Sequence, residues 1–184
     1  MFLVGFMGAG KTSVGRALAQ QLNWLFEDLD DHIERSEQRS VAEIFRDSGE
    51  DAFRQAEHAA LRRVLEDSLA ALPKIIALGG GAFAQPANVT LLNEAAVPTV
   101  FLDASVAQSW DRCCRQSTEN GIERPLLKSL EEFEKLYHRR RGSYLKAAMT
   151  IDTNGRLVNE IADEIVEKLK LKKIAIRIEE GEVE

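Results

Sequence analysis

A glycine-rich stretch near the start of the chain has the composition and spacing of a phosphate-binding loop. It reads Gly5-Phe6-Met7-Gly8-Ala9-Gly10-Lys11-Thr12, which matches the pattern G-x-x-x-x-G-K-[ST]. In such a loop, consecutive backbone N–H groups point into one concavity, and the N-terminus of the following helix adds partial positive charge. A glycine-rich turn that matches by chance is the alternative. We predict a polyphosphate site formed by Gly8, Ala9, Gly10, Lys11, Thr12 and Ser13.

Two side chains of this loop can act on the phosphates. Lys11 would reach the β- and γ-phosphates, and the Thr12 hydroxyl would take one coordination position of Mg²⁺. An apolar run from Met1 to Val4 precedes the loop, and a helical pattern from Ser13 to Leu22 follows it. This order of strand, loop and helix is the context in which the motif binds phosphate.

Two acids follow the next apolar segment. Residues 23–29 are predicted to form a second strand, which would deliver Asp28 and Asp30 at its carboxyl end. Because side chains alternate along a strand, these two acids would lie on one side, about 7 Å apart. Carboxylates placed there can serve Mg²⁺ and a substrate hydroxyl, since ligands bind at strand ends in parallel α/β sheets. Alternatively, Asp30 and Asp31 only mark the N-terminus of a helix at residues 32–38.

Three consecutive glycines, Gly79, Gly80 and Gly81, close a β-branched run from Lys74 to Leu78 that is typical of an interior parallel strand. Glycines at the carboxyl end of a strand leave room for a ligand to rest on the backbone. A flexible turn is the alternative.

The rest of the chain alternates between helix and strand. Ser40 begins a short helix with a capping box, and Gly49 separates it from a longer one that carries Arg54, either as a solvated side chain or as a ligand-binding one. Strands alternating with helices predict a three-layer α/β fold around a parallel sheet of about five strands. The longer helix is predicted at 50–69, further helices at 87–95, 103–114, 129–141 and 157–171, and strands at 97–102 and 149–152.

Residues 115–123 are polar and have no periodicity. A loop of this length in a compact domain is typically a lid or a binding loop, and a basic residue at its exit, Arg124, could meet a transferring phosphoryl group. We place the mobile lid at about residues 113–125. A surface loop without function is the alternative.

The composition limits the classes of protein that the chain can belong to. Its 184 residues, 45% of them hydrophobic, fit one globular domain, and the net charge of −6 argues against a nucleic-acid surface. The adjacent Cys113 and Cys114 are expected to be free thiols in a cytosolic protein. We expect no signal peptide and no membrane span, because the apolar runs are far shorter than the roughly 20 residues that a span needs.

Several of these motifs together resemble the shikimate kinases, from Met1 to about Leu171. The resemblance implies a nucleoside-monophosphate-kinase-like P-loop NTPase fold and transfer of the ATP γ-phosphoryl group, with Mg²⁺, to the 3-hydroxyl of shikimate in aromatic amino-acid biosynthesis. It implies a cytoplasmic monomer with ATP and shikimate as its small-molecule partners, and neither nucleic acid nor membrane. The motifs are Gly5–Thr12, Asp28-Leu29-Asp30, Phe53-Arg54 with Glu57, Gly79–Gly81, Arg124–Leu127, and Leu136-Tyr137 followed by Arg140 and Tyr144.

The resemblance also implies roles for single residues. Asp30 would hold the substrate hydroxyls and accept a proton, while Arg54 and Arg140 would hold the substrate carboxylate as two guanidinium forks. The glycine triplet would supply backbone N–H groups and room for the ring. The remaining assignments are Asp28 for Mg²⁺ through water beside Thr12, Lys11 and Arg124 for the reacting phosphates, and Arg112 for the adenine.

The chain departs from the family pattern in three places. The lid is longer than usual, so Arg115 is a rival of Arg112, and the family's usual proline is replaced by Gly142, so Arg139 is a rival of Arg140. The tail at 172–184 has no counterpart, and an edge strand or a frayed end would both fit it. Two other classes stay open: a sister kinase resembling gluconate kinase, and a non-catalytic nucleotide-binding module.

Overall fold

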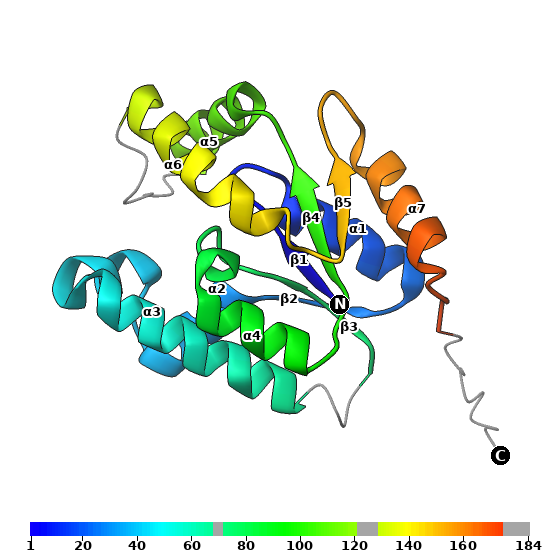
Figure 1. Cartoon of the computed structure of the whole chain (residues 1–184), viewed down its shortest axis with the longest axis horizontal. Coiled ribbons are helices and arrows are strands. Elements are labelled where there is room, and N and C mark those ends of the chain that lie inside the picture. Colours follow the sequence, from blue (N-terminus) through cyan, green and yellow to red (C-terminus); the bar gives the residue numbers. More distant parts are fainter. Residues whose placement is uncertain (68–71, 121–128, 175–184) are drawn as a thin grey trace, which may run out of the picture.

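The computed structural model describes residues 1–67, 72–120 and 129–174, which form a parallel sheet with helices on both faces (Figure 1). The order across the sheet is β2-β3-β1-β4-β5, and all four neighbouring pairs are parallel. The prediction of an α/β fold with about five parallel strands is confirmed. The strands are β1 (Phe2–Val4), β2 (Leu25–Asp28), β3 (Lys74–Ala77), β4 (Thr99–Asp103) and β5 (Met149–Asp152).

Each α-helix overlaps a segment that the sequence predicts to be helical, whereas the sequence does not predict the single 3-10 turn, η1. Among the helices of the described residues, none is both long and apolar enough to cross a membrane. In chain order they are α1 (Lys11–Leu22), α2 (Leu29–Glu37), α3 (Val41–Asp67), η1 (Ala82–Ala84), α4 (Pro86–Glu94), α5 (Val106–Asn120), α6 (Leu130–Tyr144) and α7 (Val158–Leu169).

The strand side chains alternate between two apolar clusters, one on each face of the sheet. Phe2 and Ile76 pack with residues of α2, α3, α4, α5 and α6, whereas Leu3 and Ile75 pack with α1 and α7. This alternation follows from the period of two along a strand. Because both faces are covered, the central strands are mostly apolar, which explains the β-branched run in β3.

Helix α3 is two helical segments that meet at Gly49. This glycine has φ 82° and ψ 176°, far from helical values, so the helix axis bends there. The two segments correspond to the short helix and the longer helix predicted from the sequence. The second segment carries Arg54 and Glu57 toward the sheet.

Strand β2 ends at Asp28, and Leu29 already belongs to α2. The prediction that Asp28 and Asp30 alternate along one strand is therefore wrong. Asp28 is the N-cap of α2, because its side chain accepts a hydrogen bond from the Asp30 backbone N–H at 3.2 Å. The cap satisfies an amide that has no partner inside the helix, and this favours a helix start over a longer strand.

Helix α5 continues to Asn120, so the prediction that order is lost after Cys114 is wrong for residues 115–120. Thr118 Oγ1 donates to the Cys114 carbonyl at 3.0 Å, and Arg115 lies 4.0 Å from Asp111 one turn earlier. Polar residues on the exposed side of a helix remove the apolar periodicity from which the sequence argument starts. Residues 121–125 of the expected lid lie outside the described residues.

After α7 the chain lies against the start of β2. Trp24 Nε1 donates to the Lys172 carbonyl at 3.2 Å, and the Ile174 N–H donates to the Leu22 carbonyl at 2.9 Å. Residues 172–174 form no strand. The rest of the predicted tail, 175–184, lies outside the described residues.

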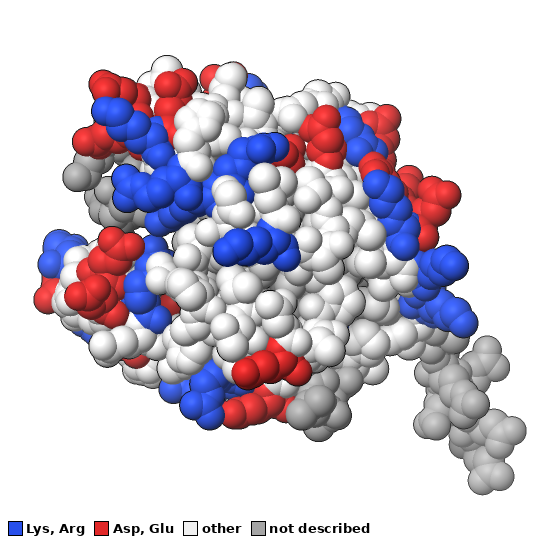
Figure 2. Space-filling view, in the orientation of Figure 1, with Lys and Arg blue, Asp and Glu red and all other residues white. Residues whose placement is uncertain are grey.

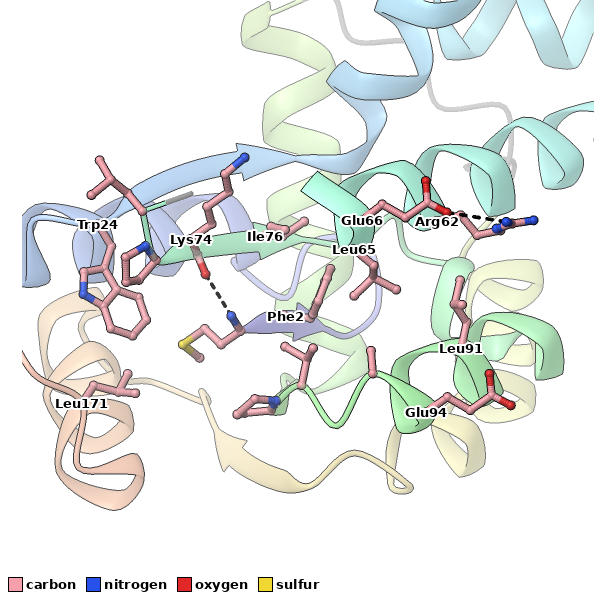
Figure 3. A pocket seen from close by; sticks show the side chains of 16 residues that line it. Phe2, Trp24, Arg62, Leu65, Glu66, Lys74, Ile76, Leu91, Glu94 and Leu171 are labelled. Atoms are coloured by element: carbon pink, nitrogen blue, oxygen red, sulfur yellow. Dashed lines mark hydrogen bonds and ion pairs between the residues drawn. The ribbon is translucent and has the colours of Figure 1, made fainter. Parts of the chain in front are cut away.

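A cavity of about 600 Å³ opens at the amino ends of the strands (Figure 3). It lies between the starts of β1 and β3 and the C-terminal ends of α3 and α4, with Trp24 and Leu171 at one side and Leu65 and Leu91 at the other. Apolar side chains dominate its wall, and no residue of the glycine-rich loop lines it. Its size alone does not make it the site for a phosphorylated ligand.

Candidate active site

A smaller cavity, of about 200 Å³, lies at the carboxyl ends of β1, β2 and β3. This is the edge at which parallel α/β sheets bind ligands. Three segments meet there: the glycine-rich loop after β1, the acids after β2 and the glycines after β3. Of the residues predicted for the site, it is lined by Gly8, Gly10, Lys11, Thr12, Ser13, Asp28, Asp30, Gly79 and Gly80.

The loop that precedes α1 passes very close to α5. Gly8 has φ 78°, and a Cβ there would lie 2.4 Å from the Ser109 carbonyl oxygen and 3.0 Å from Cys113 Sγ. Only glycine fits this approach and this backbone conformation. Gly10 is the N-cap of α1, so the positive end of that helix dipole lies at the cavity.

Lys11 is folded over its own loop. Its Nζ donates to the carbonyls of Gly5 at 2.9 Å and Phe6 at 3.0 Å, and its side chain also lines the cavity. An ammonium held at the mouth of a phosphate-binding loop can neutralise negative charge on a bound phosphate.

The Thr12 hydroxyl donates to Asp28 Oδ2 at 3.2 Å, so the two predicted metal-binding oxygens are adjacent. Burial raises the pKa of the Asp28 carboxyl, although its hydrogen bond from the Asp30 N–H and the nearby Lys11 ammonium oppose that rise. An adjacent pair of hard oxygen ligands is suited to Mg²⁺.

Asp30 and Glu57 converge on Gly79 from α2 and α3. A Cβ at Gly79 would lie 2.8 Å from Asp30 Oδ1 and 3.1 Å from Glu57 Oε1. Both oxygens are buried and have no hydrogen-bond partner among the described residues. Burial, followed by the charges of Asp28 and Glu57, raises the pKa of Asp30 to about 7. Such a pair can accept hydrogen bonds from a ligand's hydroxyl groups.

Arg54 lies against the glycine loop from the α3 side. Its Nη1 donates to Glu57 Oε2 at 2.9 Å, and its Nη2 donates to Glu50 Oε1 at 2.9 Å. A Cβ at Gly81 would lie within 2.6 Å of this guanidinium, so Gly81 provides the space that Arg54 occupies. Arg54 is therefore not a solvated side chain, because only 13% of it is exposed; it is ion-paired with Glu50 and Glu57, and it lies against the glycine triplet.

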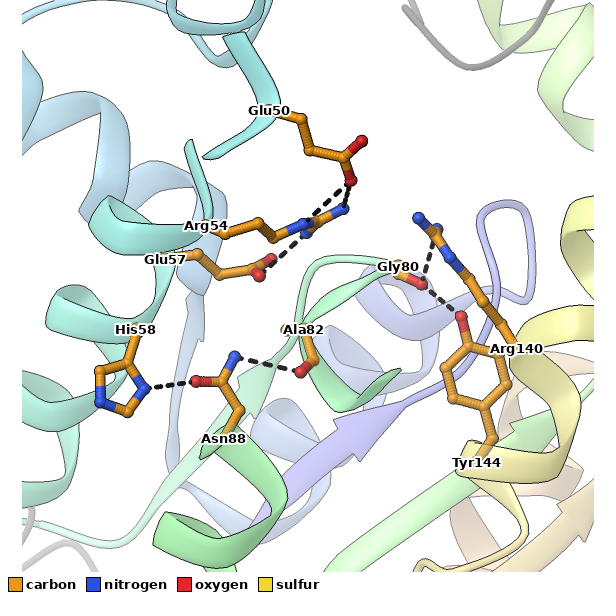
Figure 4. Close-up of polar contacts among 9 residues, drawn as sticks. All are labelled: Glu50, Arg54, Glu57, His58, Gly80, Ala82, Asn88, Arg140 and Tyr144. Carbon is orange, nitrogen blue, oxygen red and sulfur yellow. Dashed lines mark hydrogen bonds and ion pairs between the residues drawn. The ribbon is translucent and has the colours of Figure 1, made fainter. Parts of the chain in front are cut away.

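Arg140 reaches the same loop from α6 (Figure 4). Its Nη1 donates to the Gly80 carbonyl at 3.2 Å, and Tyr144 OH donates to that same oxygen. Figure 4 shows the guanidinium groups of Arg54 and Arg140 pointing toward one another across the gap beside this loop. The rival Arg139 is exposed on α6, whereas Arg140 is only 8% exposed.

Arg112 lies over the glycine-rich loop, with its Nη1 3.3 Å from the Gly8 carbonyl. Gln116, one helical turn later on α5, lines the cavity on the same side. The rival Arg115 points away, and its side chain is 72% exposed. The helical geometry of α5 thus places Arg112 and Gln116, but not Arg115, at the site.

Arg124 lies outside the described residues. Among the described residues, the sequence argument assigned no role to Glu57, Tyr144 or Gln116. Glu57 has a signal, since its spacing of three from Arg54 is that of an ion pair on one helix face. The spacing of four between Arg140 and Tyr144 is a similar signal. Gln116 gives no such signal, because the helix that contains it is predicted to end at Cys114.

Comparisons with known proteins agree with this geometry. The family model described as shikimate kinase matches residues 7–170. A shikimate kinase of Thermus thermophilus is 41% identical over 172 residues, which is 91% of this chain and 88% of that protein. One of Persephonella marina is 33% identical, over 92% of this chain and 98% of its own length. The solved shikimate kinase from Acinetobacter baumannii in complex with shikimate superimposes with a TM-score of 0.81 at 32% identity, covering 92% of this chain and 91% of that one. The chain belongs to the shikimate kinase family.

Proposed function

We propose that this protein transfers the γ-phosphoryl group of ATP to the 3-hydroxyl of shikimate. The observation that carries the proposal is the arrangement at the carboxyl ends of the strands. A phosphate-binding loop lies on one side, and on the other two arginines face each other beside two carboxylates, each of which has one buried oxygen without a partner among the described residues. A polyphosphate and a small hydroxy acid fit these two halves. The family of the chain supports the same pair of substrates.

The proposed acceptor half matches the chemistry of a cyclic hydroxy acid. The guanidinium groups of Arg54 and Arg140 can each present two N–H donors to one planar carboxylate, which fixes the orientation of the ring. Asp30 Oδ1 and Glu57 Oε1 then lie where hydroxyl groups need acceptors. The backbone of Gly79, Gly80 and Gly81 leaves room for the ring between these two ends.

Basic side chains favour the approach of anionic substrates. Figure 2 shows Lys and Arg gathered over α6, where that helix faces α3, although the whole chain carries a net charge of −6. A local positive field of this kind raises the rate of encounter with anions. We propose that both ATP and the carboxylate-bearing acceptor benefit from it.

The proposed chemical step needs one positioned base. The acceptor oxygen attacks the γ-phosphorus, the bond from that phosphorus to the β-bridging oxygen breaks, and ADP leaves. The hydroxyl proton moves to Asp30, whose pKa of about 7 suits a base near neutral pH. Lys11 and Arg124 would neutralise charge on the reacting phosphates, and Arg112 would flank the nucleotide. Positioning and charge neutralisation supply most of the catalysis in such a transfer.

The donor set at the loop fits Mg²⁺. The Thr12 hydroxyl would bind the ion directly, and the Asp28 carboxylate, 3.2 Å from that hydroxyl, would bind it through water. When bound with ATP, the ion offsets part of the phosphate charge.

We also propose that residues 1–171 form one kinase domain that acts as a monomer in the cytoplasm. The two free cysteines, one of them buried, support a reducing compartment.

A coupled ADP-release assay with shikimate, quinate and gluconate as separate acceptors tests the proposed function. We expect turnover with Mg·ATP and shikimate. Turnover with gluconate alone would assign the chain to the sister kinases, and nucleotide binding without turnover on any acceptor would indicate a binding module.

A further inference from the structure

A buried polar chain joins α3 to the segment that follows the glycine loop (Figure 4). Its centre is Asn88 on α4, which is 1% exposed. Asn88 Oδ1 lies 2.7 Å from His58 Nδ1, and Asn88 Nδ2 donates to the Ala82 carbonyl at 3.0 Å. Neither the chemistry nor the phosphate contacts described above use these residues.

The hydrogen-bonding pattern fixes the direction of each contact. A carbonyl oxygen can only accept, so the amide nitrogen of Asn88 must face Ala82 and the amide oxygen must face His58. His58 Nδ1 must then carry a hydrogen. Both the Nδ1–H neutral tautomer and the protonated ring can supply it, so the contact does not depend on the charge of His58.

These two hydrogen bonds join the immediate neighbours of the residues that we propose bind the acceptor. His58 follows Glu57, whose Oε1 lies beside Gly79, and Ala82 follows Gly81, against which the Arg54 guanidinium packs. The two hydrogen bonds, from His58 to Asn88 and from Asn88 to the Ala82 carbonyl, therefore fix the distance between α3 and the glycine loop at that point. A displacement there would move Arg54 and Glu57 relative to the loop.

We infer that Asn88 and His58 are positioning residues for the acceptor half of the site. This inference rests on the proposed function, because it concerns the proposed shikimate-binding side. Buried amides with both ends hydrogen-bonded hold their neighbours in one arrangement, and losing a partner leaves a buried polar group unsatisfied. No residue of the phosphate-binding loop takes part in these two hydrogen bonds.

The first test is the isosteric apolar variant Asn88→Leu. We expect the KM for shikimate to rise roughly 10-fold, because the residues that hold the acceptor are no longer fixed, while the KM for ATP and kcat stay within about twofold. Shikimate titration of the enzyme without ATP, followed by calorimetry, measures the same loss directly.

The matched control is Thr99→Val. Thr99 is also buried, and its Oγ1 accepts a hydrogen bond from the Ala148 N–H at 3.0 Å, at the amino end of β4. Each variant removes buried hydrogen bonding, and in each the new side chain is similar in size to the one that it replaces. The control should lower the melting temperature without changing the KM for shikimate.

A second pair of variants at half-buried His58 decides the question if Asn88→Leu fails to fold. In His58→Asn, the side-chain Nδ2–H₂ can replace the Nδ1–H donor, whereas His58→Leu has no donor. We expect a KM for shikimate near the wild-type value in His58→Asn and a several-fold higher value in His58→Leu. Equal values in the two variants would overturn the inference.

The outcomes separate the two proposals. Absence of ADP release by the wild-type enzyme with shikimate would refute the proposed function itself. Turnover by the wild type, combined with the same KM for shikimate in Asn88→Leu and Thr99→Val, would refute only the positioning role.

Discussion

Asp30 Oδ1 and Glu57 Oε1 lie 2.8 Å and 3.1 Å from one point, the position that a Cβ of Gly79 would occupy. The two carboxylates come from α2 and α3, and neither of these oxygens has a partner within the described residues. Burial raises the pKa of both groups; the charges of Asp28 and Glu57 add to the rise at Asp30, whereas the Arg54 guanidinium opposes it at Glu57. Acids with a raised pKa and an unpartnered oxygen can accept hydrogen bonds from hydroxyl groups and can take up a proton.

The raised pKa of Asp30 predicts an acidic limit to turnover. Asp30 must be ionised to accept the hydroxyl proton, and its pKa in the free protein is about 7. We expect kcat/KM for shikimate to be constant at high pH and to fall by about tenfold per pH unit well below pH 7. Initial rates from pH 5.5 to 9, with the coupling enzymes in excess, measure this profile. A profile that stays flat down to pH 5.5 would exclude Asp30 as the titrating base.

Replacing Asp30 by Asn should change activity and stability in opposite directions. The pKa of Asp30 rises from 3.8 to about 7 on folding, so the folded state holds this proton more tightly than the unfolded state does. The free energy of unfolding of the wild type therefore decreases as pH rises from about 4 to about 7 and is constant above that. Asp30→Asn removes this loss, so above pH 7 it should be more stable by up to roughly 4 kcal/mol.

The same variant should lose at least about 100-fold in kcat, since a neutral amide cannot accept the proton. Urea unfolding at pH 4 and pH 8 tests the stability part. A variant that is less stable than the wild type at both pH values would show that the raised pKa of Asp30 has no energetic consequence.

The sequence predicts the phosphate half of the site better than the acceptor half. The residues from Gly5 to Thr12 are contiguous, so their spacing alone defines the loop. The acceptor half is assembled from α2, α3, α6 and the glycine triplet. Its geometry depends on how distant segments pack, and spacing along the chain does not contain this information.

The wrong predictions also have physical causes. Asp28 and Asp30 are predicted to alternate at the carboxyl end of one strand because apolar residues precede them, but the Asp28 side chain caps the next helix, so the strand ends at Asp28 and Asp30 lies in α2. The end of helix α5 is predicted too early because the residues after Cys114 are polar on the buried and the exposed side alike, so no apolar periodicity marks the helix. The sequence gives no signal for the hydrogen bonds of the Asn88 amide. One partner, His58, is 30 residues away, and the other is the backbone carbonyl of Ala82, which any residue type could supply.

Two glycine-to-alanine variants should have opposite consequences. In Gly79→Ala, the new methyl group would collide with Asp30 Oδ1 and Glu57 Oε1, so we expect kcat/KM for shikimate to fall roughly 100-fold with little change in ATP affinity. In Gly142→Ala, no atom lies within 4 Å of the new Cβ, and the residue is inside α6. That variant should keep wild-type activity and gain up to about 1 kcal/mol of stability. Steady-state kinetics and thermal unfolding of both proteins check the pair, and normal acceptor kinetics in Gly79→Ala would contradict the site geometry.

Lys11→Ala should abolish turnover. The variant removes the ammonium that lines the loop cavity, and we expect a loss of roughly 1,000-fold or more in kcat, because no other described loop side chain carries positive charge. Lys146→Ala, at an exposed position after α6, serves as the control and should be unaffected. A Lys11→Ala protein with near-normal kcat would refute the assignment of the phosphate-binding loop.

Lysine substitutions at two adjacent arginines separate charge from geometry. Arg140 is buried and bonded to the Gly80 carbonyl, whereas Arg139 is exposed on the same helix. A lysine keeps the positive charge but cannot form the two parallel N–H contacts that a guanidinium makes with a carboxylate. We therefore expect Arg140→Lys to raise the KM for shikimate about tenfold or more while the KM for ATP is unchanged, and Arg139→Lys to leave both within twofold. If Arg139→Lys raised the KM for shikimate and Arg140→Lys did not, the carboxylate would have to bind on the exposed side of α6, and the acceptor half as described here would be wrong.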